Sequence, residues 1–397
     1  MNHYLRITIN RRQFVRVGCL ASAAALAGWP AAARAEDNGS VFNLEPSEKH
    51  PRNSEGSFVT LKSGRILFFY TQFYGGSGDE NPARIVSICS DDGGRTWSGK
   101  PAVVVENGTA ANVMSVSVLR LQSGAIGLFY LVKNNLLDCR PMMRVSRDEA
   151  ETWSEARQVG EAPGYFVLNN DRIIQLKNGR LVAPVAFHRA RASNPKSYHS
   201  LDSCGLALWY LSDDEGKTWQ EAQTWWALPA RTHTGLQEPG VVELLDGRLF
   251  SWMRTDQGAQ FGCYSTDGGQ NWPLPERTTL QSPESPASIK RLPGSADLLA
   301  IFNDHSGRFT FSKGKRTPLV AAISSDGGKS WPRCRLIEEN PDGCYCYAAI
   351  HFTADAVLLA YCAGDSKVGG LSRLRLRRMS LQWLKADGPS TAIVPSN

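Results

Sequence analysis

The sequence lacks the features by which several classes of protein are recognised. Beyond residue 35 it contains no apolar run long enough to cross a bilayer, no helical periodicity of convincing length, and no linker rich in Gly/Ser or Pro. It also contains no glycine-rich phosphate loop and no Cys/His spacing typical of a zinc site. These absences argue against a membrane-spanning chain, a TIM barrel and a doubly wound fold. We expect no cofactor, and the sequence leaves a structural calcium ion open.

The sequence has little net charge once its N-terminus is set aside. The 397 residues include 44 Lys+Arg and 38 Asp+Glu, a formal charge of +6. Five of the arginines lie within residues 1–35, which contain no acidic residue, so residues 36–397 carry only +1. The overall positive charge therefore gives no reason to expect nucleic acid or an anionic membrane as a partner.

The basic N-terminus predicts an export signal. A double arginine, Arg11-Arg12, precedes an apolar run over residues 17–29, and residues 33–35 form an Ala-x-Ala cleavage pattern. The segment resembles a twin-arginine signal, with an ordinary secretory peptide as the alternative. The apolar run is too short to anchor the chain in a bilayer. We therefore expect residues 1–35 to be removed and the protein to be periplasmic or secreted.

Eight cysteines follow residue 35. Cys344 and Cys346 are two residues apart in a β-rich segment, so both thiols are expected on one side of a strand. We predict buried strand cysteines. One or two disulfides stay open for an exported protein.

One motif, Ser-x-Asp-x-Gly/Ala-x-Thr/Ser/Asn-Trp, is repeated five times. The copies start 56, 66, 53 and 59 residues apart. Each has a turn-forming core between β-rich flanks, which predicts a hairpin whose Asp bonds the turn backbone while the Trp packs beneath it. The copies are Ser90–Trp97, Ser146–Trp153, Ser212–Trp219, Ser265–Trp272 and Ser324–Trp331.

A second, fainter repeat sets the number of units. Six tight turns of the type Leu-x-x-Gly-Arg, or looser relatives, recur along the chain, and five of them are followed by the first motif. The motifs are on average 58.5 residues apart, so residues 36–397 hold about six units. We predict an all-β, six-bladed β-propeller as one domain over 36–397. A strand near Val41–Leu44 is expected to complete the last sheet, which contains Leu371–Leu384.

The five motifs resemble the Asp-box, or BNR, repeats of the sialidase superfamily, and the resemblance covers nearly all of residues 36–397. It implies that the boxes lie on the outer rim of the propeller, away from the active site. Sialidases of this kind hydrolyse a carboxylated keto-sugar with a tyrosine nucleophile, a glutamate that takes the phenol proton and an aspartic acid that protonates the leaving group. Three arginines bind the sugar carboxylate, for which planar guanidinium groups are suited. A neutral phenol approaches the anomeric carbon without repulsion from that carboxylate.

The resemblance assigns catalytic roles residue by residue. Glu238 matches the proton-abstracting glutamate, and Tyr347 matches the nucleophile. Tyr345 is the alternative nucleophile, because period-2 alternation places both rings on one face of a strand. Asp79, which follows a glycine-rich loop, matches the general acid, with Glu80 as the fallback.

The same comparison assigns the residues that would bind substrate. Arg52 and Arg254 match the first two arginines, although the usual Arg-Ile-Pro around the first is absent. Arg316 matches the third arginine, with Arg308 as a rival. Polar residues at the starts of inner strands, or at the ends of the strands that return, are expected to line the pocket with them: Asn112, Asn170, Asp171, Arg172, His188 and Tyr345.

The implied function is an exported exo-glycosidase, similar to an exo-α-sialidase, that acts with net retention on sialylated or other acidic glycans. A polysaccharide lyase or uronic-acid glycosidase, with His188, His199 or Tyr198 as base, is one alternative. A non-catalytic carbohydrate-binding propeller is another, because fold alone does not determine function. The oligomeric state is left open.

Overall fold

The computed structural model describes residues 40–228 and 232–386, so the predicted signal peptide over residues 1–35 lies outside the described residues. Within these ranges the chain is almost entirely strands and loops. The exceptions are a three-residue 3-10 helix, Tyr198–Ser200, and the five-residue helix α1, Leu381–Lys385. Neither has the length or apolar character needed to cross a membrane. The prediction of an all-β fold is confirmed.

Hydrogen bonds join the strands into five sheets. Three sheets are four-stranded and follow chain order: β2 to β5, β15 to β18, and β19 to β22. Their strands are β2 (Arg52–Thr60), β3 (Ile66–Phe73), β4 (Ala83–Ser90), β5 (Ala102–Val105), β15 (Gln237–Glu243), β16 (Leu249–Arg254), β17 (Phe261–Ser265), β18 (Glu276–Arg277), β19 (Ser288–Arg291), β20 (Leu298–Asn303), β21 (Leu319–Ser324) and β22 (Arg333–Glu338).

The last sheet combines both ends of the described chain. Its order is β1-β25-β24-β23, with β1 (Val41–Leu44), β23 (Cys344–Phe352), β24 (Ala356–Gly364) and β25 (Leu374–Ser380). Strand β1 runs antiparallel to β25, with Val41 opposite Arg377. The prediction that the N-terminal strand completes the last sheet is therefore confirmed.

The remaining sheet has nine strands and holds two of the units expected from the sequence. A single parallel pairing, Tyr165 opposite Cys139, links β10 to β8 and so joins the two units. Hydrogen bonding thus gives five sheets where six separate units were expected. The strands are β6 (Asn112–Arg120), β7 (Ile126–Asn135), β8 (Asp138–Ser146), β9 (Arg157–Gln158), β10 (Tyr165–Val167), β11 (Ile174–Gln175), β12 (Leu181–Ala190), β13 (Leu201–Ser212) and β14 (Gln220–Glu221).

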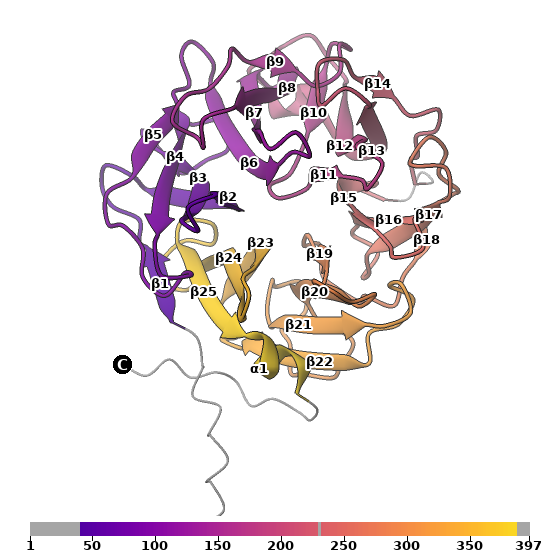
Figure 1. Ribbon diagram of the computed structural model, residues 1–397. Helices are drawn as coiled ribbons and strands as arrows, with labels where there is room; N and C mark the ends of the chain where they lie inside the picture. The colour runs from indigo at the N-terminus through magenta and orange to yellow at the C-terminus, as the bar shows by residue number, and fades with distance from the viewer. Residues whose placement is uncertain (1–39, 229–231, 387–397) are drawn as a thin grey trace, which may run out of the picture. The chain divides into compact units, whose positions relative to one another are not determined.

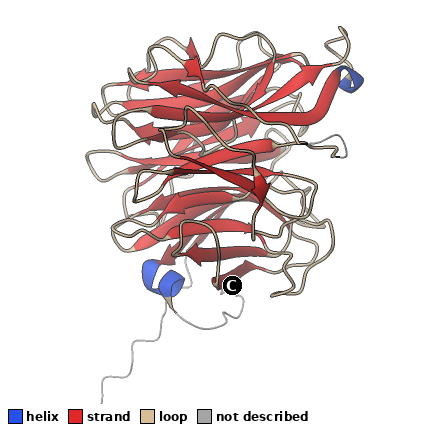
Figure 2. Ribbon diagram, turned by 90° about the vertical axis from the view of Figure 1, so that its right-hand side faces the viewer, coloured by secondary structure: helices blue, strands red, loops and turns tan. Residues whose placement is uncertain are grey.

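The sheets follow one another around a common centre, and β2, β6, β11, β15, β19 and β23 lie on the side of the sheets that faces it (Figure 1). Seen from the side, the strands cross the molecule and the connecting loops lie at its two edges (Figure 2). Because consecutive strands are antiparallel, the start of β2, the end of β3 and the start of β4 share one edge. The Asp-box that follows β4 lies at the opposite edge.

The five Asp-boxes fold as predicted. In the first, Ser90 Oγ donates to Asp92 Oδ1 (2.8 Å), and the same oxygen accepts from the backbone N–H of Thr96 (2.9 Å). The same Ser-to-Asp bond recurs in the other four boxes. The tryptophans pack beneath the turns, as where Trp272 stacks on Trp209 with ring centroids 4.4 Å apart. Each box therefore fastens the outer part of its unit.

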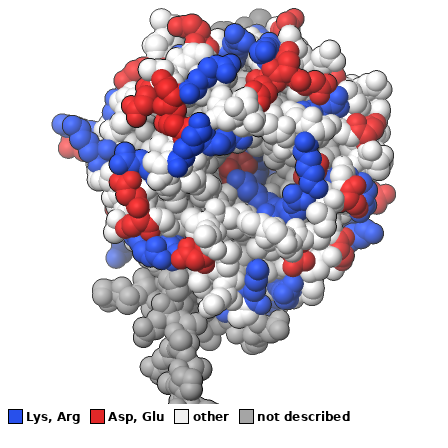
Figure 3. All heavy atoms as spheres, in the orientation of Figure 1, with Lys and Arg blue, Asp and Glu red and all other residues white. Residues whose placement is uncertain are grey.

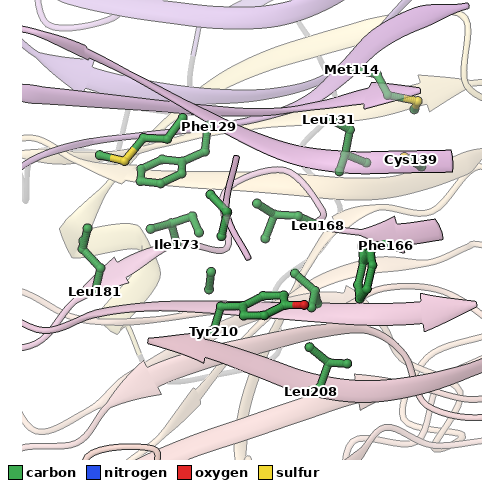
Figure 4. Close-up of a cluster of buried hydrophobic side chains, with 14 of the residues drawn as sticks. Met114, Phe129, Leu131, Cys139, Phe166, Leu168, Ile173, Leu181, Leu208 and Tyr210 are labelled. Atoms are coloured by element: carbon green, nitrogen blue, oxygen red, sulfur yellow. The ribbon is translucent and has the colours of Figure 1, made fainter. Parts of the chain in front are cut away.

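Buried apolar side chains fill the space between neighbouring units. Figure 4 shows one such cluster, in which Met114 and Phe129 from β6 and β7 lie near Phe166, Leu208 and Tyr210 from β10 and β13. Each fully buried side chain of this size contributes about 1.5–3 kcal/mol relative to an exposed one. This packing holds the inner strands in fixed positions around the centre.

Four inner strands share an irregularity that positions their side chains. The pairing register shifts in β2, β6, β15 and β23. A non-glycine residue with positive φ lies in each shift: Glu55 (54°), Ser115 (60°), Glu238 (49°) and Tyr347 (57°). Such conformations cost about 1–3 kcal/mol and cluster at functional sites, and bulges re-aim side chains. In these four strands, the side chains near one edge of the molecule therefore do not alternate strictly between the two faces of the sheet.

Candidate active site

Tyr347 and Glu238 form the centre of the site. The Tyr347 hydroxyl donates to Glu238 Oε1 across 3.0 Å, and Arg254 Nη1 donates to the same oxygen at 2.7 Å. The second oxygen of Glu238 is buried and has no partner among the described residues. Burial, followed by the charge of Glu238, raises the pKa of Tyr347 well above its usual value. The phenol is therefore neutral and contacts a carboxylate that can accept its proton.

Arg254 is held between two carboxylates. Its Nη2 donates to Glu284 Oε1 at 2.5 Å, while Nη1 holds Glu238. Burial alone would lower the pKa of Arg254, but the interactions with Glu238 and Tyr347 and the hydrogen bond to Glu284 together outweigh burial, so the pKa is raised. The guanidinium is fixed as a permanent positive charge beside the Tyr347–Glu238 pair.

Arg52 lies at the start of β2 and is buried among acceptors. Its Nη1 donates to Asp79 Oδ1 at 2.6 Å and its Nη2 to Glu55 Oε1 at 3.0 Å. Burial would lower the pKa of Arg52, but Glu55 and Asp79 outweigh it and raise the pKa. Burial also raises the pKa of Glu55 to about 7, in spite of the opposing charge of Arg52.

Asp79 is carried on the loop between β3 and β4, and its backbone is fixed by other strands. The Asp79 carbonyl accepts from Asn112 Nδ2 and, at 2.7 Å, from Lys133 Nζ of β7. The predicted pocket residue Asn112 therefore fixes this loop. The Asp79 side chain is 55% exposed. Burial would raise its pKa, but Arg52 and Lys133 outweigh burial and lower it.

Arg316 rather than Arg308 reaches the site. The Arg316 guanidinium lies 5.5 Å from the centroid of the Tyr347 ring, and its Nη1 donates to Cys346 Sγ at 3.1 Å. Arg308 instead donates to the carbonyl of Trp331, in the fifth Asp-box. The three arginines assigned from the sequence, Arg52, Arg254 and Arg316, therefore surround Tyr347 and its neighbours.

A cavity of about 80 Å³ lies beside Tyr347, Glu55 and Asp79. It is lined by residues from the first three units and β23: Glu55, Asp79, Met114, Ser115, Leu131, Lys133, Tyr165, Val167, Asn169 and Tyr347. Figure 3 shows a hollow near the middle of the face seen there, with basic and acidic side chains inside it. The described residues hold no group of three or more His, Cys, Asp or Glu side chains arranged to ligate a metal ion.

The predicted pocket residues Asn170, Asp171 and Arg172 are occupied by bonds to inner strands. Asp171 accepts from Ser57 Oγ (2.8 Å) and Lys290 Nζ (2.7 Å), and its other oxygen accepts from the backbone of Ile350 (2.9 Å). The Asn170 side chain donates to the Gly56 and Tyr347 carbonyls, and Arg172 donates to Ser288 Oγ and the Ala287 carbonyl. This segment links the inner strands, and its contact with substrate stays a prediction.

The position of Tyr345 differs from the one expected if side chains alternated regularly along β23. The register shift after Cys346 and the positive φ of Tyr347 separate the two rings. Tyr345 packs in the apolar core with its ring 6.4 Å from that of Tyr361, whereas Tyr347 lines the cavity. The prediction that Tyr345 shares the face of Tyr347 is wrong.

The excursion between β12 and β13 reaches the rim of the site. The Tyr198 hydroxyl donates to Glu80 Oε2, so Glu80 contacts this excursion while its neighbour Asp79 contacts Arg52.

His188 is buried behind the cavity, where its Nδ1 lies 2.9 Å from the Asp202 carbonyl and its ring lies against Tyr165. Burial lowers the pKa of His188. His199 is exposed.

Sequence reasoning missed four residues that contact the predicted ones: Glu55, Ser115, Lys133 and Glu284. A usable signal exists for the first. Glu55 precedes Gly56 in an inner strand, just as Glu238 precedes Pro239-Gly240. A Cβ at Gly56 would come within 2.5 Å of the Phe69 carbonyl, and one at Gly240 within 2.2 Å of the Trp252 ring. An acidic residue just before a glycine in an inner strand therefore marks these bulges.

Comparison with known proteins finds sialidases that are similar to this chain. A sialidase of Micromonospora viridifaciens is 26% identical over 401 residues, covering 87% of this chain and 58% of the relative. A sialidase of Bacteroides fragilis (strain YCH46) is also 26% identical, covering 79% of this chain and 59% of the relative. The chain thus spans a little under three fifths of the length of these curated relatives. The intramolecular trans-sialidase from Ruminococcus gnavus, solved with oseltamivir carboxylate, has a TM-score of 0.68 at 17% identity, covering 90% of this chain and all of that one.

At such identities the likeness to a solved structure concerns the fold alone. The match to a family rests on sequence. Residues 72–359, well over half of the chain, match the model of the BNR repeat-like domain. All five Asp-boxes described above lie within the matched residues. The chain belongs to the BNR repeat-like domain family of the sialidase superfamily.

Proposed function

We propose that this protein is an exported glycoside hydrolase that removes a terminal sialic acid, or a closely related carboxylated sugar, from glycans. The observation that carries the proposal is the Tyr347–Glu238–Arg254 contact, in which a neutral phenol meets a carboxylate fixed by a guanidinium. The sialidases among the relatives support the same class of reaction. We further propose that the repeated units form a six-bladed propeller and that residues 1–35 direct export.

The proposed reaction begins with transfer of the phenol proton of Tyr347 to Glu238 as the phenol oxygen attacks the anomeric carbon. The negative charge that Glu238 loses passes through the phenol oxygen to the leaving-group oxygen, which takes the proton of Asp79, so that the charge ends on the Asp79 carboxylate. Arg254 contacts Glu238 throughout and keeps its oxygen aimed at the phenol. The bond between the sugar and its leaving group breaks in the same step.

Asp79 would give its proton to the departing oxygen and later remove a proton from the attacking water. In the structure Arg52 and Lys133 keep the pKa of Asp79 low. A substrate carboxylate that displaces Asp79 from Arg52 would remove the contact that lowers this pKa, and so allow Asp79 to be protonated in acidic solution. Water attack on the anomeric carbon then releases the Tyr347 oxygen, which recovers its proton from Glu238, and completes a double displacement with net retention.

The excursion between β12 and β13 favours one second candidate. Tyr198 of this excursion donates to Glu80 at the rim of the site, and the resemblance to sialidases does not account for it. Such an insertion can shape the pocket for a different acidic sugar. A uronic-acid glycosidase using the same residues is therefore the second candidate.

Parallel assays with fluorogenic aryl glycosides test the proposal. We expect release of fluorophore from an α-sialoside and, by NMR, an initial product with the α configuration of the substrate. Release from a β-glucuronide or α-galacturonide alone would replace sialic acid by a uronic acid. Binding of acidic glycans without hydrolysis of any of these substrates would instead favour a non-catalytic protein.

A further inference from the structure

The guanidinium of Arg52 is almost fully used by the protein itself. Its Nε donates to Ser54 Oγ at 3.0 Å, and its Nη1 donates to the Ser77 carbonyl at 3.1 Å and to Asp79. Its Nη2 donates to Glu55. Four of the five N–H groups of the guanidinium therefore have partners. A substrate carboxylate cannot bind Arg52 through two parallel hydrogen bonds unless one of these partners yields.

The two carboxylates beside Arg52 differ in their freedom to yield. Asp79 lies on a loop and its side chain is 55% exposed, so it can turn toward solvent. Glu55 is 3% exposed and lies in the bulge of β2, with its other oxygen bonded to Ser115 Oγ. A Cβ at the next residue, Gly56, would come within 2.3 Å of the Phe68 ring, so this ring lies directly against the backbone of the bulge. Glu55 therefore stays beside Arg52 when a ligand enters.

Charged and titratable groups from several strands face Glu55. Arg52 is the nearby cation. Asp79 and Glu238 of β15 are nearby carboxylates, and Tyr347 of β23 interacts with Glu55 more weakly. Cys362 of β24 also interacts with Glu55. A ligand carboxylate would add another negative charge to this group. Like charges in a buried site are relieved most readily when one carboxylate takes up a proton.

We propose that Glu55 takes up a proton when the carboxylate of a sugar acid binds Arg52, so that binding of the sugar strengthens as the pH falls. The inference rests on the proposed function, because it assumes a carboxylated ligand. The proton comes from solvent, resides on Glu55 while the site is occupied, and returns to solvent when the ligand leaves. Glu55 is thus a positioning residue that stays beside Arg52 and adjusts the charge next to it when a ligand binds.

The burial that keeps Glu55 in place also brings its pKa to about 7, so the effect falls within an accessible pH range. A ligand that binds only the protonated form would bind about tenfold more weakly at pH 8 than at pH 6. Over the same interval, the number of protons taken up on binding should rise from near zero to nearly one. Substitution of Glu55 by Gln removes the titrating group and should remove both effects.

The experiment is isothermal titration calorimetry with the 2,3-didehydro analogue of sialic acid and with glucuronate as probes. Titrations at pH 6 and pH 8, each in two buffers of different ionisation enthalpy, give the affinity and the proton uptake. The wild-type measurement needs no substitution, so the test does not depend on folding of E55Q. Glu106→Gln, which neutralises a carboxylate paired with Arg84 outside the cavity, is the matched control and should behave as wild type.

The possible outcomes test the proton uptake by Glu55 and the proposed function independently. Binding without proton uptake at pH 8 would overturn the role of Glu55 while leaving the hydrolase intact. Proton uptake that persists in E55Q would assign it to another group and also overturn the proposal. Proton-linked binding of glucuronate without turnover of any sialoside would support Glu55 and reject sialic acid as substrate. Absence of binding by either probe would overturn both.

Discussion

The Tyr347 hydroxyl donates to Glu238 across 3.0 Å, although 109 residues separate the two in the chain. Strand β23 supplies the phenol and strand β15 the carboxylate, each from a bulge with positive φ. Neither strand is hydrogen-bonded to the other, since they belong to different sheets. The contact therefore depends on how whole sheets pack around the centre.

Removal of either member of this pair should abolish most turnover. Tyr347→Phe deletes the attacking oxygen, and Glu238→Gln deletes the proton acceptor, so we expect kcat on a fluorogenic sialoside to fall by about 10²–10⁴-fold in each. Tyr345→Phe, two residues away in the apolar core, is the matched control and should keep wild-type activity. Full activity in Y347F, or a comparable loss in Y345F, would contradict the assignment.

The role of Asp79 should depend on the leaving group. An aryl leaving group departs without much help from an acid, whereas the oxygen of a natural glycan must be protonated. Asp79→Asn should therefore lower turnover of sialyllactose by about 10²-fold or more and affect an aryl sialoside much less. Glu80→Gln provides the comparison, because Glu80 bonds Tyr198 instead of Arg52. If E80Q shows the leaving-group dependence and D79N does not, Glu80 is the acid.

Cys346 should act on substrate binding through Arg316. The Arg316 Nη1 donates to Cys346 Sγ at 3.1 Å, and the thiol is buried directly before Tyr347. Cys346→Ala removes that acceptor and loosens the guanidinium, so we expect KM to rise several-fold while kcat changes little. Cys263→Ala, a buried thiol in another unit, controls for the loss of a buried sulfur. A fall in kcat at unchanged KM would point to damage of the Tyr347–Glu238 pair instead.

Glu55 should make stability depend on pH. Its pKa rises from 4.5 in the unfolded chain to about 7 in the folded protein, so the folded state binds the proton more tightly. This contribution to the free energy of unfolding is largest below pH 4.5 and declines as the pH rises to 7, by about 3 kcal/mol in total. Urea unfolding of wild type and E55Q between pH 5 and pH 8 should show their difference growing in favour of E55Q. A difference that stays constant with pH would contradict the prediction.

Asp171 should contribute to stability more than to binding. It accepts hydrogen bonds from β2, β19 and β23, and Asp171→Ala leaves Lys290 without its carboxylate. Loss of a buried ion pair costs about 3–5 kcal/mol, and the 35% exposure of the Lys290 side chain places the expected loss near the lower end. Asp213→Ala, which breaks an exposed pair with Arg180, should cost under about 1 kcal/mol. If the folded D171A protein instead shows a large rise in KM, Asp171 contacts substrate.

The sequence by itself determined the all-β class, the five Asp-box hairpins and the closing strand β1, because each depends on short-range chemistry that repeats. The Asp of a box bonds backbone within four residues of itself, so its pattern is visible locally. The resemblance carried by these boxes also named Tyr347, Glu238, Arg52, Arg254 and Asp79, which meet around one site.

The tertiary structure alone decided how those side chains are aimed. A bulge in β23 turns Tyr347 toward the cavity and leaves Tyr345 in the core, against the period-2 expectation. Such a bulge places an extra residue in one strand of a pair, and period-2 alternation along that strand does not predict it. Lys133 and Glu284 became visible only as partners of Asp79 and Arg254, whereas Glu55 has the sequence signal of an acidic residue before a glycine. Short-range repetition specifies the units, whereas long-range packing specifies the site.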